Sequence, residues 1–159
     1  MDSSEEDRTA GDAEAKLART GRMLALIGFV PFAVLALWLY GIAPGHPWRQ
    51  GTILLLTTYG AVVLSFLGGI RWGLALFVRE GHRERDIILS IVPPLTGWIA
   101  VIVPPPLTFV FLAVAFAAQG AWDSLTLTPE AVPSWYRRVR IQLTLLVVAA
   151  LVVAFVATS

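Results

Sequence analysis

Few side chains of this sequence are placed to do chemistry, and the most unusual is Arg71, which ends the apolar run 51–70. An ionisable residue within a membrane segment usually pairs with another or lines a polar cavity. Asp123 follows a later apolar run at a similar depth, and Asp86 begins another, so both are candidate partners. The sequence predicts a structural ion pair of Arg71 with Asp123 or Asp86, which we favour over a proton relay. The alternative is an unpaired arginine that extends to the membrane interface.

The side chains that enzymes use as nucleophiles and bases are poorly placed for catalysis. Ser65 and Ser90 lie in apolar runs with no histidine expected at their depth, although nucleophilic catalysis requires an adjacent base. The sequence contains no cysteine, and His46 and His82 lie in loops expected on opposite sides of a membrane. No phosphate-binding loop, zinc motif or triad spacing is present. We therefore expect no enzyme activity, no metal site and no cofactor.

The composition indicates that lipid, not water, surrounds most of the chain. Hydrophobic residues make up 57% of the sequence and charged residues 14%, against roughly a quarter charged in soluble domains. The net charge of +1 is too small to suggest nucleic acid. The long uncharged runs predict an all-α membrane domain, 21–159, with five transmembrane helices at about 23–40, 51–78, 87–103, 106–122 and 137–158. The polar residues 1–20 predict a disordered acidic tail.

The basic residues predict the orientation of these helices. Cytoplasmic loops carry an excess of arginine and lysine, and with five spans all but two of the twelve basic residues fall on one side. The exceptions are Arg49, on the other side, and Arg71, within a span. The sequence predicts a cytoplasmic N-terminus and a periplasmic C-terminus.

Prolines and small residues predict helix shape and packing. A proline within a helix removes a backbone donor and kinks it, so we expect kinks at Pro31, Pro93 and Pro94. Small residues let neighbouring helices approach closely. We expect a packing face, toward a neighbouring helix or a second copy, built from Ala61, Ser65, Gly68, Gly69 and Gly73.

An aromatic and basic segment precedes the last apolar run. Aromatic and arginine side chains together are typical of the membrane interface and can hold an anionic lipid head group. We expect interface anchors at Trp135, Tyr136, Arg137, Arg138 and Arg140. The six tryptophans fit interface belts, and the alternative is an aromatic pocket for a flat apolar ligand.

Residues 59–73, Tyr-Gly-Ala-Val-Val-Leu-Ser-Phe-Leu-Gly-Gly-Ile-Arg-Trp-Gly, resemble the signature of the domain of unknown function 3429 family. Three further stretches resemble the same family, at 28–32, 90–98 and 133–140. The family comprises small multi-spanning proteins of bacterial inner membranes, with a mitochondrial relative among animal transmembrane proteins. The resemblance implies a fold and an inner-membrane location, and it implies no activity.

Together these patterns favour a non-enzymatic role in packing, assembly, or binding of lipid or a partner. The expected partners are the lipid bilayer, including anionic lipid, and a second copy or another membrane protein, without nucleic acid. The alternative is a binder or transporter of a small molecule or ion that uses kinked helices and a tryptophan-rich pocket. The length, five spans and tryptophan content also resemble the translocator-protein family, in shape and composition only.

Overall fold

The computed structural model describes residues 3–77, 83–126 and 132–159, and in these ranges all regular secondary structure is α-helical. The helices are α1 (Ser3–Gly41), α2 (Arg49–Phe77), α3 (Arg83–Leu89), α4 (Val92–Ile102), α5 (Leu107–Thr126) and α6 (Ser134–Thr158). Five segments are long and apolar enough to cross a membrane, and α3 and α4 together supply the third. The prediction of an all-α protein with five such helices is therefore confirmed.

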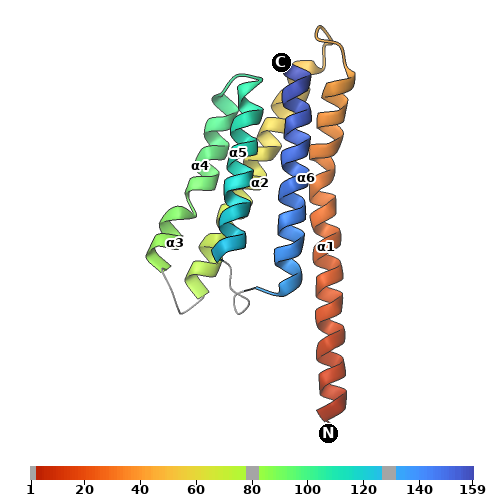
Figure 1. The fold of residues 1–159 in the computed structure, drawn as a ribbon, viewed down its shortest axis with the longest axis vertical. Helices are drawn as coiled ribbons and strands as arrows, with labels where there is room; N and C mark the ends of the chain where they lie inside the picture. Colours follow the sequence, from red (N-terminus) through yellow and green to blue (C-terminus); the bar gives the residue numbers. More distant parts are fainter. Residues whose placement is uncertain (1–2, 78–82, 127–131) are drawn as a thin grey trace.

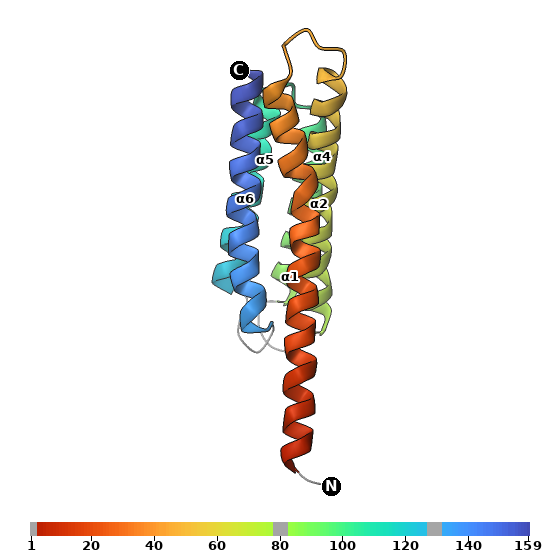
Figure 2. The same cartoon turned by 90° about the vertical axis from the view of Figure 1, so that its right-hand side faces the viewer.

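The helices form one bundle whose two chain ends lie at opposite ends, as an odd number of spans requires (Figures 1 and 2). Each of α1, α6, α5, α4 and α2 contacts the next around the bundle, and α2 closes the ring against α1. Leu56, Leu112 and Leu151, from α2, α5 and α6, are fully buried between them. The outer surface is also apolar: Leu37 and Val114 are each 63% exposed. Such a surface suits lipid as the surrounding solvent.

The first helix differs from the expectation of a disordered tail over residues 1–20. It begins at Ser3 and continues unbroken through Pro31 to Gly41, a length of about 58 Å for its 39 residues. Residues 13–18, Ala-Glu-Ala-Lys-Leu-Ala, are strong helix formers. Because they extend a helix that the apolar run already nucleates, they avoid the cost of a separate nucleus. The N-terminal part of α1 therefore projects beyond the other helices (Figure 1).

The third span is broken near its two prolines. The break lies at Ser90 and Ile91, and Pro93 and Pro94 occupy the first turn of α4, where a missing N–H costs little. The carbonyl groups of Leu89 and Ser90 would normally accept bonds from residues 93 and 94, which have no N–H to donate. The side chain of Ser90 turns inward and donates to the Ile87 carbonyl at 2.6 Å. The prolines thus separate α3 from α4.

Candidate functional site

Three helices each bring one charged side chain to the same end of the bundle. Arg71 of α2, Asp123 of α5 and Arg140 of α6 are only 5%, 4% and 8% exposed. Each lies on the face of its helix that carries the core residues, as Asp123 does with Leu112 and Phe116. In a helix, residues three, four or seven positions apart share a face. The same periodicity that buries the apolar side chains therefore buries these three charges together.

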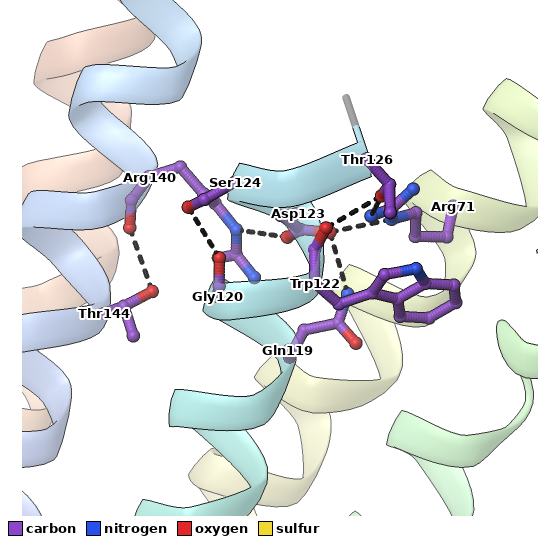
Figure 3. A network of polar contacts seen from close by, with 9 residues as sticks. All are labelled: Arg71, Gln119, Gly120, Trp122, Asp123, Ser124, Thr126, Arg140 and Thr144. Atoms are coloured by element: carbon purple, nitrogen blue, oxygen red, sulfur yellow. Dashed lines mark hydrogen bonds and ion pairs between the residues drawn. The ribbon is translucent and has the colours of Figure 1, made fainter. Parts of the chain in front are cut away.

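Asp123 is the centre of this cluster (Figure 3). Its Oδ1 accepts a hydrogen bond from Arg71 Nε at 2.7 Å, and its Oδ2 accepts one from Arg140 Nε at 2.7 Å. Gln119 Nε2 also donates to Oδ1, at 3.1 Å. Charge-assisted hydrogen bonds of this kind are about twice as strong as neutral ones. One carboxylate therefore joins α2, α5 and α6.

Arg71 makes two further contacts with α5. Its Nη2 donates to the Thr126 hydroxyl, and its Cζ lies 4.3 Å from the centroid of the Trp122 ring. A guanidinium over an aromatic face is attracted by the ring quadrupole. Sequence reasoning missed Trp122, Thr126 and Gln119 as members of the site. The available signal was their spacing around Asp123, which puts all four on one face of α5.

Arg140 is less completely satisfied than Arg71. Its Nη2 is buried and has no hydrogen-bond partner among the residues that the structure describes. Two guanidinium groups share one carboxylate, which leaves one formal positive charge in the cluster. Arg71 and Asp123 lie near the C-terminal ends of α2 and α5, where the helix dipoles favour positive charge. The arrangement joins three helices, and both oxygens of Asp123 accept hydrogen bonds from arginines.

Of the two candidate partners for Arg71, the structure brings Asp123 to it. Asp86 lies in the first turn of α3 and is half-buried. Its backbone carbonyl accepts a bond from Ser90 N at 3.0 Å, which belongs to the end of α3. That bond is an ordinary helical one, and Asp86 is not part of the arginine cluster.

The small residues of α2 divide between the two sides of the helix. A Cβ added to Gly68 would lie 2.5 Å from the Ser90 carbonyl oxygen, so the break in the third span rests on Gly68. A Cβ added to Gly97 of α4 would lie 2.9 Å from the Cα of Ala61, so α4 also packs closely against the backbone of α2. The other members of the expected face are not covered: Ser65 is exposed, and Gly69 and Gly73 have nothing within 4 Å of an added Cβ. The reason is that steps of four residues advance about 40° beyond a full turn, so the stripe winds out of the interface.

Close packing also involves glycines outside that stripe. A Cβ on Gly60 would meet Leu112 at 3.1 Å, and one on Gly120 would meet the Thr144 side chain at 2.5 Å. These positions join α2 to α5 and α5 to α6. A search for small residues at every fourth position does not find them, because Gly60 lies outside that series on α2 and Gly120 lies on α5.

The aromatic and basic segment at the start of α6 divides into three parts. Trp135 packs on α1, where a Cβ on Gly21 would lie 2.5 Å from its ring. Its Nε1 is buried and has no partner within the described part of the chain. Tyr136 lies beside it, with ring centroids 6.1 Å apart. Arg137 and Arg138 are exposed, whereas Arg140 is buried in the cluster. Arg140 therefore differs from the expected interface anchor, because α6 turns it toward α5.

The tryptophans do not gather into one pocket. Four of them are between 43% and 71% exposed, namely Trp38, Trp48, Trp72 and Trp98. They lie on α1, before α2, on α2 and on α4. Trp122 contacts Arg71, and Trp135 contacts α1.

Comparison with known proteins identifies the family. A family model described as "Protein of unknown function (DUF3429)" matches residues 17–156. The chain belongs to the DUF3429 family. Transmembrane protein 69 of Xenopus tropicalis is 30% identical over 139 residues, which are 86% of this chain and 53% of that protein. The chain thus spans about half the length of this curated relative. No solved structure matches the chain.

The stretches that resemble DUF3429 in sequence meet in space around α2. Tyr59 donates from its hydroxyl to the Gly28 carbonyl at 2.7 Å, and its ring lies 5.0 Å from that of Phe32. The break at Ser90 rests on Gly68, and Arg71 and Arg140 meet at Asp123. In this DUF3429 protein, a multi-pass membrane protein, the four stretches form one connected packing unit.

Proposed function

We infer that this protein is a non-enzymatic packing and assembly protein, which presents a rigid helical bundle to lipid or to another membrane protein. The observation that carries this inference is the use of both Asp123 oxygens by buried arginines of two other helices. A carboxylate bonded in this way links the helices that carry it and its partners. Removing one partner of a buried ion pair is strongly destabilising, so the Asp123 cluster keeps three helices in register.

The break in the third span supports the same role. In transporters, broken helices leave backbone groups open to a substrate near the middle of the membrane. Here the Ser90 carbonyl lies against Gly68, and the Ser90 hydroxyl donates to Ile87. The Ser90 carbonyl is therefore covered by α2, and the Ser90 hydroxyl already has a hydrogen-bond partner.

The proposed location is the bacterial inner membrane, with the N-terminus in the cytoplasm and the C-terminus in the periplasm. Helices α3 and α6 both begin at the end of the bundle from which the N-terminus projects (Figure 1), and Arg85 and Arg138 lie near the starts of these two helices. At the other end, Arg49 donates to the carbonyl oxygens of Ile42, at 3.2 Å, and Ala157. Arg49 thus neutralises the negative ends of α1 and α6, and the remaining basic side chains follow the positive-inside rule.

The uncovered small face of α2 supports a protein partner. Ser65, Gly69 and Gly73 leave a shallow strip on which the backbone of another helix can pack closely. The partner is a second copy of this chain or another membrane protein.

A second candidate function is the binding or transport of a small anion. It is favoured by the unpartnered Nη2 of Arg140 in a cluster with one excess positive charge. Buried polar groups normally have a partner, and an anion or a water molecule would supply one.

Mass spectrometry of the protein purified in mild detergent tests these alternatives. We expect a stoichiometric lipid, a second copy or a membrane protein to co-purify. Gly69→Leu with Gly73→Leu should reduce co-purification of a protein partner without unfolding the chain, because neither site is in contact. Ala149→Leu, on the exposed side of α6, is the control. A stoichiometric small anion that is lost with Arg140→Leu would instead support the second candidate.

A further inference from the structure

An open groove of about 640 Å³ runs between α1 and α6 on the outside of the bundle. These two helices lie side by side in both views (Figures 1 and 2). The volume is in the range of ligand sites in proteins, about 300–1,000 Å³. Its walls include Arg22, Leu26, Arg138, Gln142, Leu145 and Leu146.

The polarity of these walls changes along the helix axis. Arg22 lies one turn below Leu26 on α1, and Arg138 lies one turn below Gln142 on α6. Leu146 follows a further turn above Gln142, so about 12 Å separates the level of Arg138 from that of Leu146. The groove is thus cationic at the end nearer the N-terminal projection and apolar above it. A phospholipid within a leaflet has the matching order, with its phosphate at the membrane surface and its acyl chains deeper.

The two arginines of the groove differ from those of the buried cluster. Arg71 and Arg140 both bond to Asp123. Arg22 and Arg138 are exposed, and within the described ranges of the chain neither forms an ion pair with a carboxylate. A guanidinium group matches the geometry of a phosphate with two parallel hydrogen bonds. Both arginines line the same groove, and a phosphate would supply the negative charge that they lack.

We propose that this groove binds one anionic phospholipid, whose phosphate lies between Arg22 and Arg138 and whose acyl chain lies along Leu26 and Leu146. Gln142, one turn above Arg138, supplies an amide donor for the phosphate or the glycerol ester. An apolar helix of a second protein would remove both arginines from water without a counter-charge, which is costly. A lipid supplies that counter-charge at the depth where the arginines lie. This site rests on the lipid-binding part of the proposed function and gives it a location.

The test measures phospholipid binding to the full-length chain in neutral detergent, by native mass spectrometry, with phosphatidylglycerol or phosphatidylcholine added. Wild-type protein should retain phosphatidylglycerol in preference to phosphatidylcholine. Each arginine near a membrane surface contributes about 1 kcal/mol, so Arg22→Gln with Arg138→Gln should weaken phosphatidylglycerol binding about 30-fold. Arg19→Gln with Arg137→Gln removes the same charge from exposed positions outside the groove and should change binding by less than about threefold. An equal loss in both double variants, or no loss in either, overturns the site.

A second readout uses wild-type protein and does not depend on how the variants fold. Phosphatidylglycerol with a photoreactive acyl chain should cross-link chiefly to Leu26 of α1 and to Leu145 and Leu146 of α6, and inorganic phosphate should not compete. Cross-links chiefly to α4, or full competition by phosphate, would contradict a lipid in this groove. Either result would leave protein-partner binding intact, because the Gly69 and Gly73 variants test that separately.

Discussion

The single side chain of Asp123 accepts hydrogen bonds from guanidinium groups of two other helices. A buried ion pair contributes little compared with apolar packing of the same volume, because both charges lose their hydration. Breaking it is another matter, because the remaining charge stays buried without compensation. The cluster therefore adds little to the stability of the native fold. Its main effect is to raise the free energy of any arrangement that separates α2, α5 and α6.

Asp123→Asn should destabilise the protein by about 3–5 kcal/mol, because it keeps the side-chain volume and leaves two arginines without a counter-charge. Arg71→Leu should lower the folded yield in the same direction. Thermal unfolding in detergent measures the change. Asp86→Asn, outside the cluster, is the matched control and should melt like the wild type. If Asp123→Asn and Arg71→Leu also melt like the wild type, the cluster has no structural role.

Part of the cluster could be predicted from the sequence. Arg71 and Asp123 are found because both close long apolar runs, and depth in a membrane follows directly from sequence position. Arg140 was missed because it sits beside Arg137 and Arg138, which do lie at the surface. Arg140 differs from Arg137 and Arg138 in the side of α6 on which it lies. It precedes buried Val147 by seven residues, or about two turns, and so shares its face.

At the scale of the helices, glycine contacts decide how closely α2 and the third span approach. The Ser90 carbonyl packs against Gly68, and the Ala61 backbone packs against Gly97. The sequence indicates that small residues pack, but it does not indicate against which helix. Composition alone also describes residues 1–20 as a separate polar tail, whereas residues 3–20 extend the first membrane-spanning helix.

Gly68→Ala and Gly97→Ala should each destabilise the bundle by about 1–3 kcal/mol, because the added methyl group would meet backbone atoms that cannot move freely. Gly69→Ala and Gly73→Ala, on the same helix as Gly68, meet nothing within 4 Å. They should be neutral or stabilising by about 0.5–1 kcal/mol, since alanine favours a helix. Chemical unfolding of the four variants side by side makes the comparison. Equal effects at Gly68 and Gly69 would contradict the packing described.

At the scale of the whole molecule, the number of segments able to cross a membrane follows from hydropathy, which depends only on local composition, and the prediction of five such segments is confirmed. The arrangement of helices around α2 could not be predicted, since it depends on which faces fit together. The orientation that we propose from the positive-inside rule places the arginine cluster toward the cytoplasm.

Cysteine labelling in cells tests this orientation and the span number most directly, because the sequence has no cysteine of its own. Ser3→Cys and Ser159→Cys are introduced singly and treated with a membrane-impermeant maleimide. We predict that Ser159→Cys reacts in intact spheroplasts and that Ser3→Cys reacts only after the membrane is opened. Reaction of both positions from the same side would contradict a five-span bundle with its arginine cluster near the cytoplasmic face.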